Sequence, residues 1–557
     1  MTDLKIPVGI SDFAKIRNYN YYYVDKTGLI EDLLENETAE VTLITRPRRF
    51  GKTMGMSMLA NFFDIRKDSK AMFTGLEISK NAALCKEWMN QWPVVFLSFK
   101  NIDGDKFSLA YQQMVYEIGL LYDSYSELLS SNKLSEDDKA LFLQLKRRTA
   151  NEIDVLRSIQ FLLSLLYKHY GKTVILLLDE YDVPLAKSSA HGYYPEMLNV
   201  IKSMMTTSLK DNNTLRFAVI TGCLRIAKES IFTGTNNFVS DTISSSHLNE
   251  YFGFTQADVD QILKDADCME HADDIKNWYD GYHFGNLDVY CPWDVMNYLR
   301  DLQRNPKAKP ASYWKNTSDN SIIRSFIDYA GHSISRKLEI LLSGGYILQR
   351  IEENLTYDYL HSSEENLWSI LYLTGYLTQA REEDLPEPLP EGSSALMIPN
   401  AEVREIFETT IQKWFDESAQ TWNRKALFDA VWSGDTETLT KEMNKLLRKT
   451  ISYHDYREDF YHAFLAGIFA GAGYEVDSNK EHGEGRSDVV VLDPEGDRVA
   501  IFEAKYSRTQ DAMPRDCAAA LQQIEDRQYA KEFEEDYDSI LCYGIAFYKK
   551  RCLVQTK

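Results

Sequence analysis

Residues 41–53 read VTLITRPRRFGKT, and this stretch decides how the first part of the chain folds. Its apolar start, Val41–Thr45, has the composition of a buried strand, and its end is Gly51, Lys52 and Thr53. A phosphate-binding loop lies between a strand and a helix, because N–H groups at the helix start then point at the phosphates. We therefore predict an ATP site here, with Lys52 on the outer phosphates and the Thr53 hydroxyl on Mg²⁺.

One position departs from the usual spacing of such a loop. The template places a glycine about five residues before Gly51, where this chain has Arg46. The added cations Arg46, Arg48 and Arg49 could crowd the phosphates or face a partner. Of the loop residues, we expect Arg49 and Gly51 to contact the nucleotide together with Lys52 and Thr53.

A second acidic motif supports the ATP site. The apolar run 174–178 leads into Asp179 and Glu180, and the run 217–220 leads into Thr221. An acid at the end of a parallel strand can hold Mg²⁺, and the next acid can polarise the attacking water. We expect Asp179 at the metal, Glu180 in catalysis and Thr221 near the γ-phosphate. Arg225 follows and could meet phosphate within the chain or across an interface between copies.

The order of apolar runs predicts an α/β fold for the first part of the chain. Strands are expected at 41–45, 94–97, 174–178 and 217–220, with helical segments such as 153–167 between them. Strands that alternate with helices form a parallel sheet with helices on both faces.

The chain of 557 residues is long enough for several domains. From about residue 250 the pattern becomes mainly helical. A helix at 367–372, a strand at 375–378, a proline-rich tip at 385–392, a strand at 395–398 and a helix from 401 fit either a winged-helix unit or a simple hairpin. The last hundred or so residues form a further small α/β unit. We expect domains at 1–245, 246–430 and 431–557.

Two carboxylates meet in the C-terminal unit if its expected hairpin forms. Strands are expected at 488–492 and 499–502, joined by a turn at 493–496, with a helix at 516–529 and a strand near 542–548. Side chains alternate along a strand, so Glu503 and Lys505 share a face, and the hairpin brings Asp488 alongside. Two carboxylates can bind Mg²⁺, which activates water, while Lys505 supports the negative charge. We predict a phosphodiesterase site here, although acids near such a Glu-x-Lys run also occur in ordinary surface hairpins.

Bulk properties narrow the function classes. The net charge of −22 argues against a broad cationic surface, so any basic groove must be local. The seven cysteines show no disulfide or zinc spacing and are typical of a reducing cytosol. We see no signal peptide and no run of about 18 uncharged apolar residues, so we expect a cytoplasmic location without a membrane partner.

The chain resembles the bacterial AAA-ATPase-like proteins, in which a P-loop ATPase is fused to a C-terminal PD-(D/E)XK nuclease-superfamily domain. That family also lacks the first glycine of the loop, so Arg46 is no defect under this resemblance. The motifs that carry it are Ile10–Phe13, Tyr23–Thr27, Pro47–Thr53, Asp179–Asp182, Gly222–Arg225, Tyr251–Thr255 and Trp278–Tyr282.

The resemblance implies a restriction-endonuclease-like fold for the C-terminal unit. Gln522, Gln523 and Tyr529 then match the glutamine and tyrosine helix of the family, with Gln523 at the catalytic site. Related nucleases carry an additional acid upstream, for which Glu458 and Glu481 are rivals, with Tyr461 and His462 beside the first. Lys480, Arg486, Lys505 and Arg508 would supply a local positive field.

These features lead to one expected function and two alternatives. We expect an ATP-binding and ATP-hydrolysing protein, dependent on Mg²⁺, whose ATPase domain controls cleavage of nucleic acid, DNA rather than RNA. In the first alternative, the ATPase is a regulatory switch and the nuclease-like domain only binds nucleic acid or protein. In the second, the ATPase drives a homo-oligomer in a signalling or defence assembly.

Overall fold

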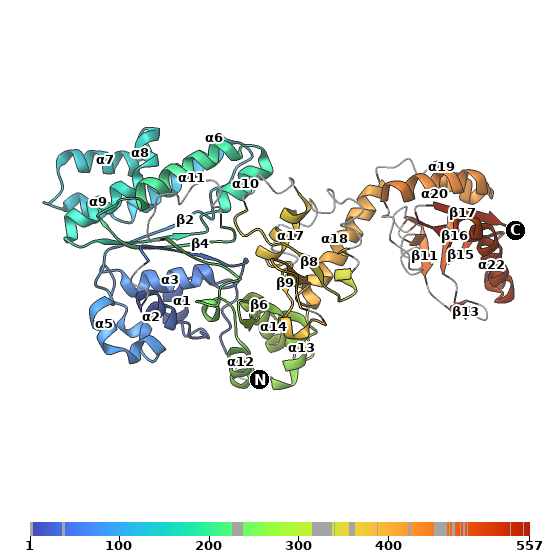
Figure 1. Cartoon of the computed structure of the whole chain (residues 1–557), viewed down its shortest axis with the longest axis horizontal. Coiled ribbons are helices and arrows are strands. Elements are labelled where there is room, and N and C mark those ends of the chain that lie inside the picture. Colours follow the sequence, from blue (N-terminus) through green and yellow to red (C-terminus); the bar gives the residue numbers. More distant parts are fainter. Residues whose placement is uncertain are drawn as a thin grey trace. The chain divides into compact units, whose positions relative to one another are not determined.

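The computed structural model of the chain forms two compact units, Met1–Ser318 with Tyr346–Glu405 and Asp319–Gly345 with Ile406–Lys557 (Figure 1). The residues it describes are 4–35, 39–225, 238–314, 337–338, 340–355, 363–386, 388–420, 425–450, 465–466, 468–469, 474–478, 481–482, 485–486, 488–534, 536–549 and 551–557.

A five-stranded parallel sheet forms the centre of the first unit. Its strand order is β2-β3-β4-β1-β5. The four strands expected from apolar runs are confirmed, and the fifth was not foreseen. Their bounds are β1 (Val41–Thr45), β2 (Val94–Ser98), β3 (Val174–Asp179), β4 (Leu215–Gly222) and β5 (Phe238–Asp241).

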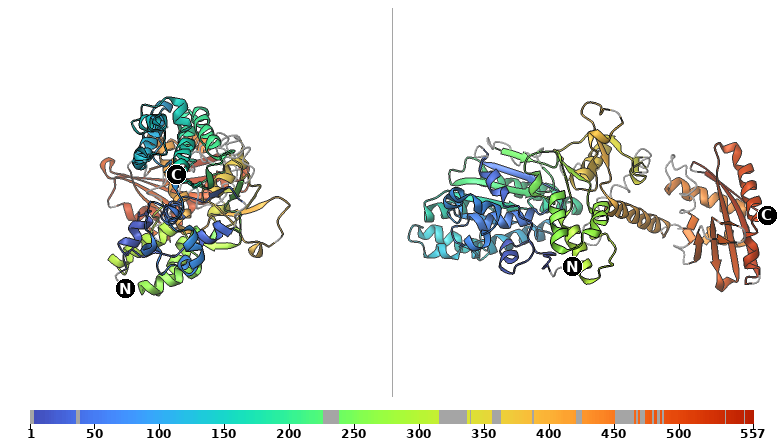
Figure 2. Two further views of the ribbon diagram at one scale, coloured as in Figure 1. Left: turned by 90° about the vertical axis from the view of Figure 1, so that its left-hand side faces the viewer. Right: turned by 90° about the horizontal axis from the view of Figure 1, so that it is seen from below.

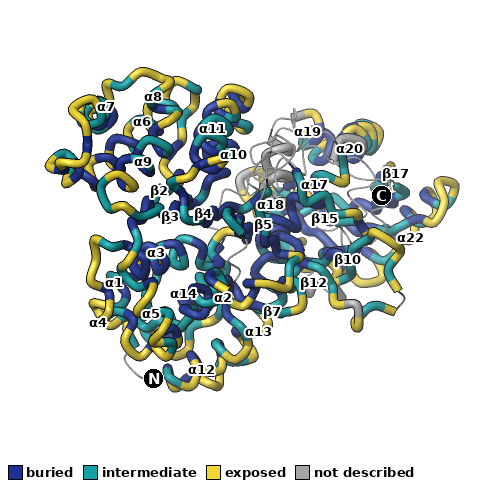
Figure 3. Tube along the Cα trace, turned by 60° about the vertical axis from the view of Figure 1, so that its left-hand side comes forward, coloured by how far each residue is buried: buried dark blue, intermediate teal, exposed yellow. Residues whose placement is uncertain are grey.

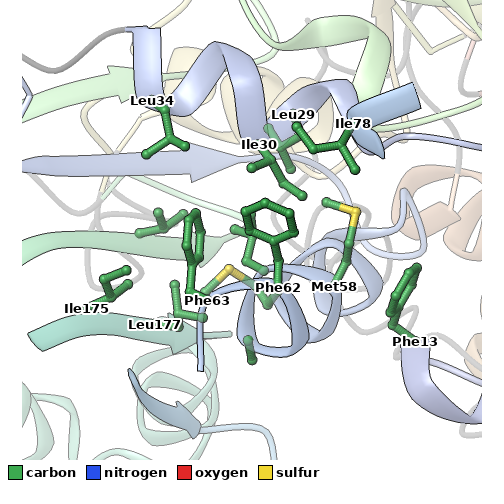
Figure 4. Packing of buried hydrophobic residues seen from close by; sticks show 14 of the residues in the cluster. Phe13, Leu29, Ile30, Leu34, Met58, Phe62, Phe63, Ile78, Ile175 and Leu177 are labelled. Carbon is green, nitrogen blue, oxygen red and sulfur yellow. The ribbon is translucent and has the colours of Figure 1, made fainter. Parts of the chain in front are cut away.

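Helices cover both faces of this sheet, as expected (Figure 1). On one face lie α1 (Phe13–Asn18), α2 (Gly28–Glu35) and α3 (Lys52–Phe63), and Figure 4 shows their apolar side chains meeting those of β3. The expected helix at 153–167 is two helices, α8 (Glu152–Leu156) and α9 (Ser158–Tyr170). The remaining helices of this part are α4 (Lys70–Phe73), α5 (Ala82–Trp88), α6 (Phe107–Asp123), α7 (Glu136–Lys146), α10 (Val183–His191) and α11 (Tyr194–Leu209). Buried residues gather on the strands and on the inner helix faces (Figure 3).

The middle region is mainly helical and contains a small antiparallel sheet. β8 (Ile347–Gln349), β10 (Ser394–Met397) and β9 (Thr378–Gln379) pair in that order, with α17 (Glu364–Leu373) between β8 and β9. A simple hairpin would contain β9 and β10 alone, so the third strand favours the winged-helix interpretation. The other elements are α12 (Gln256–Ala266), α13 (Ala272–Tyr279), β6 (Tyr282–Phe284), β7 (Leu287–Val289), α14 (Pro292–Arg304) and α18 (Ala401–Gln420).

The second unit contains a mixed sheet of order β11-β14-β15-β16-β17. β15 and β16 are parallel, and the other pairs are antiparallel. Helices lie on both of its faces (Figure 2), with α20 against β17 and α22 against β16. The bounds are α19 (Lys425–Ser433), α20 (Thr436–Thr450), β11 (Glu475–Ser478), β12 (Glu481–His482), β13 (Gly485–Arg486), β14 (Val489–Asp493), β15 (Arg498–Tyr506), α22 (Met513–Asp526), β16 (Ser539–Tyr548) and β17 (Arg551–Thr556).

Two differences from the expected C-terminal elements matter for the site. β15 is longer than expected and contains Glu503 and Lys505 within the strand rather than at its end. The helix expected at 516–529 ends at Asp526, and Tyr529 lies in the short 3-10 turn that follows.

Among the described helices, none is long and apolar enough to cross a membrane.

Candidate nucleotide and metal sites

The phosphate-binding loop has the expected strand and helix on its two sides. β1 ends at Thr45 and α3 begins at Lys52. Arg49 and Gly51 have positive φ values of 74° and 86°, which turn the chain tightly into the first turn of α3. A helix of this length directs free N–H groups and the positive end of its dipole at the loop, so the backbone forms an anion cradle.

The Lys52 ammonium is buried at the bottom of this cradle. It donates hydrogen bonds to the carbonyl oxygens of Arg46 and Pro47, at 2.7 and 2.8 Å. It also contacts the Cys223 sulfur at 3.8 Å. A cation whose hydrogen-bond partners are neutral groups retains a strong attraction for phosphate, because ionic partners bind it more strongly than neutral ones do. Lys52 therefore fits the expected phosphate contact.

The expected metal ligands lie together at the ends of β3, β4 and α3. The Asp179 carboxylate is fully buried and accepts hydrogen bonds from the Thr53 hydroxyl at 2.9 Å and from the Thr221 hydroxyl at 2.6 Å. A hydroxyl and a carboxylate at this distance are a suitable pair of oxygen ligands for Mg²⁺. Thr221 is bonded to Asp179, so its position is that of a residue that orients the acid.

Glu180 lies next to this acid and lines the same cavity as the loop. Its φ is 53°, an uncommon conformation for a residue with a side chain. Burial raises the pKa of its carboxyl, while Lys52 and Arg48 act in the opposite direction. A partly buried carboxylate with a raised pKa is a better proton acceptor than an exposed one, which suits activation of water.

The turn after β4 is held by the acidic motif. Asp182 accepts hydrogen bonds from the N–H groups of Cys223 and Leu224, at 2.9 and 3.0 Å. Gly222 packs so closely that a Cβ there would lie 2.7 Å from the Tyr181 ring. This turn leads directly into Arg225, whose Nε is buried and lacks a hydrogen-bond partner within the described residues.

Arg46 does not crowd the phosphates and does not face a partner, so both expectations for it are wrong. Its side chain is fully buried and forms an ion pair with Asp241 at the end of β5. It also donates to the Asp241 carbonyl at 3.1 Å, and its guanidinium lies 5.5 Å from the Phe252 ring centre. Arg46, which occupies the position of the missing glycine, therefore connects the loop to the edge strand β5.

A cavity of about 360 Å³ extends from the loop between the N-terminal segment and α14. Its walls are mostly apolar, which suits the base and ribose of a nucleotide whose phosphates lie on the loop. Arg49 lines it beside Trp293, with the guanidinium 5.2 Å from the ring centre. The cavity wall also contains residues to which the sequence assigned no role in the nucleotide site, among them Val8, Tyr251, Phe254, Trp293, Met296 and Asn297.

Asp25, the acid of the Asp25–Thr27 motif, has a structural role. Asp25 accepts hydrogen bonds from Thr27 and from the Glu77 N–H, so it fixes the entry into α2. Lys26 lines the rim of the cavity and pairs with Asp258 at 2.6 Å.

In the second unit, strand pairing brings the predicted carboxylates together. Val489 pairs with Phe502, which places Asp488 directly beside Glu503. Asp488 accepts a hydrogen bond from the Ala504 N–H at 2.7 Å, and Lys505 donates to Glu503 Oε1 at 3.1 Å.

Glu503 is the electrostatically unusual member of this pair. Only 1% of the residue is exposed, and its Oε2 is buried without a hydrogen-bond partner in the described part of the chain. Burial, and next the charge of Asp488, raise its pKa to about 7, while Lys505 acts against the rise. A buried carboxyl oxygen without a donor, facing a second acid, is the environment that a cation would stabilise. No cluster of three or more such ligand side chains occurs within the described residues, and Mg²⁺ requires only one or two.

Helix α22 approaches this pair closely. Gly544 pairs with Glu503 on the neighbouring strand, and a Cβ on Gly544 would lie 2.4 Å from the Cys517 carbonyl oxygen of α22. Gln523 of α22 hydrogen-bonds Tyr529. Burial raises the pKa of Tyr529, and the charges of Glu503 and Asp488 add to this rise. Gln523 therefore lies in the expected neighbourhood, although it contacts the tyrosine.

Comparison with known proteins finds a family match in each of two segments of the chain. Residues 7–232 match the family model of the AAA-ATPase-like proteins, described as predicted AAA-ATPases. Residues 456–557 match the model of the PD-(D/E)XK nuclease superfamily. The chain joins an AAA-ATPase-like domain to a PD-(D/E)XK nuclease-superfamily domain. A relative from Azotobacter chroococcum mcd 1, an uncharacterized protein in the vnfD 5′ region, is 25% identical over 565 residues, which cover 98% of this chain and 97% of the relative.

Some expected residues of the nuclease-superfamily domain lie outside the described residues. These are Glu458, Tyr461, His462 and Lys480. The additional acid of this domain therefore stays a prediction, and so do the domain limits at 245 and 430.

Proposed function

We propose that the AAA-ATPase-like domain binds ATP with Mg²⁺ and hydrolyses it. The buried contact of Thr53 with Asp179, beneath the Lys52 cradle, is the observation that carries this proposal. The cradle and Lys52 would hold the phosphates, while Thr53 and Asp179 would hold the metal, which neutralises charge on the transferred phosphoryl group. Glu180 would accept the proton of the attacking water as the bond from the γ-phosphorus to the bridging oxygen breaks. Arg49, Thr221 and Arg225 would complete the site.

We propose further that the nuclease-superfamily domain hydrolyses phosphodiester bonds. Asp488 and Glu503 would hold Mg²⁺, whose role is to lower the pKa of bound water and to stabilise the charge on the phosphate. Lys505 lies within hydrogen-bonding distance of Glu503 and would support the attacking oxygen. Gln523 would act at the same site through its place on α22.

The expected partner is nucleic acid, and we favour DNA over RNA. A groove of about 650 Å³ in this domain supports a nucleic-acid partner, because Lys441, Lys445 and Arg551 line it and none of its lining residues is acidic. Such a local set of cations is what an acidic chain needs to contact a phosphate backbone. The seven free thiols support the predicted cytoplasmic location.

Two substitutions test the two sites independently. Lys52→Ala should weaken ATP binding by about 2–5 kcal/mol, as expected for loss of a buried charged partner, whereas the exposed Lys70→Ala should not. Calorimetry on the full chain measures both. ATP binding by Lys52→Ala at wild-type affinity would refute the phosphate site.

Asp488→Ala should reduce Mg²⁺-dependent cleavage by more than about 100-fold, since loss of even an outer partner of a metal ligand has effects of this order. Asp511→Ala, an exposed acid of the same domain, is the control. Cleavage that survives Asp488→Ala would show that the assigned site is wrong. If no nucleic acid is cleaved with Mg²⁺ or Mn²⁺, the domain acts as a binding module.

A further inference from the structure

Helix α14 has two different faces in the first unit. On one face, Val295, Leu299 and Leu302 are buried in the apolar core that α14 shares with α12 and α13. The other face lines the nucleotide cavity, and its residues are Pro292, Trp293, Met296 and Asn297. Their spacing of one and four residues places them on one side of the helix. Of these four side chains, only that of Asn297 carries a strong hydrogen-bond acceptor.

The Asn297 amide is held in one orientation. Only 4% of the residue is exposed, and its Nδ2 donates a hydrogen bond to the Trp293 carbonyl at 2.7 Å. A carbonyl needs an N–H partner, so the amide nitrogen faces Trp293 and Oδ1 is directed away from it. The Trp293 ring in turn lies 5.2 Å from the Arg49 guanidinium, so the amide is fixed close to the phosphate-binding loop.

Asn297 Oδ1 meets no hydrogen-bond donor among the residues that the structure describes, and it is not one of their sealed polar atoms. Asparagine is a poor residue for a helix interior, and burial of an amide with an unpaired oxygen costs free energy. Leucine, of similar size, would therefore stabilise α14 better at this position. An acceptor that keeps some accessible surface in a buried residue of a cavity wall indicates a contact with a ligand.

The tyrosine hydroxyls of the same wall are already used within the chain. The Tyr22 hydroxyl donates to Asp265 at 2.7 Å, and the Tyr251 hydroxyl donates to Asp32 at 2.8 Å. These bonds hold the wall together, whereas Asn297 offers an acceptor to the cavity.

The surroundings of Asn297 suit a base better than a sugar. Val8, Phe254 and Met296 contribute apolar surface to the cavity. A ribose has several hydroxyl groups that need polar partners, whereas a flat aromatic base with one amino group suits apolar walls with one acceptor.

We propose that Asn297 selects the base of the bound nucleotide: its Oδ1 accepts a hydrogen bond from the 6-amino group of adenine. This inference deepens the proposed ATP site and rests on it. Guanine and hypoxanthine carry a carbonyl oxygen at the same ring position, so two acceptors would face each other without a proton between them. Asn297 is thus a specificity-determining residue that favours ATP over GTP.

The wild-type chain provides the first test, by calorimetry in Mg²⁺. ATP is compared with purine riboside triphosphate, in which hydrogen replaces the 6-amino group, and with inosine triphosphate, which carries the 6-carbonyl. ATP should bind about tenfold more tightly than purine riboside triphosphate, the size of one such hydrogen bond, and inosine triphosphate should bind no better than the latter. Equal affinities for ATP and either analogue would overturn the proposal.

The variant Asn297→Leu provides the second test. It should bind ATP and purine riboside triphosphate within about twofold of each other, because the acceptor is gone. Asn305→Leu, at an exposed asparagine just beyond the end of α14, is the control and should keep the tenfold preference. A preference for ATP that survives Asn297→Leu would overturn the proposal.

Two further outcomes separate this proposal from its neighbours. If Asn297→Leu abolishes a preference for ATP over 2′-deoxy-ATP instead, Oδ1 binds the ribose and the selection of the base by Asn297 is wrong. If the wild-type chain binds none of these nucleotides, the proposed phosphate site fails, and the role of Asn297 fails with it.

Discussion

The buried charged groups of the phosphate site have hydrogen-bond partners, whereas the carboxylate site contains a buried carboxyl oxygen without one. At the phosphate site, Lys52 bonds to two loop carbonyls, and Asp179 accepts hydrogen bonds from the hydroxyls of Thr53, Thr221 and Ser98. At the carboxylate site, Glu503 keeps a buried oxygen without a donor and a pKa of about 7. The first is a preformed cradle in which a ligand replaces existing contacts. The second is an unbalanced pair of acids that a cation would stabilise.

The largest effect on stability should come from restoring the usual glycine of the phosphate loop. Arg46→Gly leaves Asp241 as a buried charge without its partner, so unfolding free energy should fall by about 3–5 kcal/mol. Arg48→Gly, at an exposed position in the same loop, should lower it by less than about 1 kcal/mol. Urea denaturation of the two variants measures the difference. Equal losses would show that the Arg46 ion pair is not what holds the loop.

This position also shows where sequence reasoning stopped. The strands at 41–45 and 174–178 were predictable, because long apolar runs in this order leave little choice of fold. The role of Arg46 was not predictable, since its partner Asp241 is 195 residues away in the sequence. Asp241 also lies in a short strand whose sequence, Phe-Val-Ser-Asp, has no strong pattern. A missing template residue was visible in the sequence, but its replacement contact was not.

The second largest expected effect follows from the raised pKa of Glu503. Its pKa of about 7 lies above the ordinary 4.5, so the native state retains a proton that the unfolded chain has lost. Wild-type stability should therefore fall as pH rises from about 4.5 to about 7. Glu503→Gln removes this penalty and should stabilise the metal-free domain by up to about 3 kcal/mol at pH 8, with little gain at pH 4.

Thermal unfolding with and without Mg²⁺ provides the measurement for Glu503. Mg²⁺ should stabilise the wild-type chain and leave Glu503→Gln unchanged, because binding to the native state alone raises stability. The exposed Glu534→Gln should behave as wild type in both respects. A loss of stability in Glu503→Gln at pH 8 would contradict the raised pKa.

The carboxylate site was easier to locate from sequence than to understand. Alternation along strands placed Glu503 and Lys505 on one face, and the turn at 493–496 set the approach of Asp488. The burial of Glu503 could not be read in this way, because it depends on α22 packing over Gly544.

The smallest expected effect concerns the contacts of the phosphate site. Thr221→Val removes the hydroxyl that binds Asp179 and leaves a buried carboxylate oxygen without it, so stability should fall by about 1–2 kcal/mol. Thr42→Val, on the neighbouring strand β1, is the control and should change it by less than about 0.5 kcal/mol. Denaturation midpoints followed by tryptophan fluorescence compare the two. An unchanged stability for Thr221→Val would mean that Asp179 does not need this bond.

The most direct test of the account is whether the state of one site changes the activity of the other. The full chain is incubated with single- and double-stranded DNA and RNA in Mg²⁺, with and without ATP. ATP should change the rate of cleavage by the wild-type chain, Lys52→Ala should cleave at one rate in both conditions, and Asp488→Ala should not cleave. Cleavage by the wild-type chain at the same rate with and without ATP would contradict the control of the nuclease-superfamily domain by the AAA-ATPase-like domain.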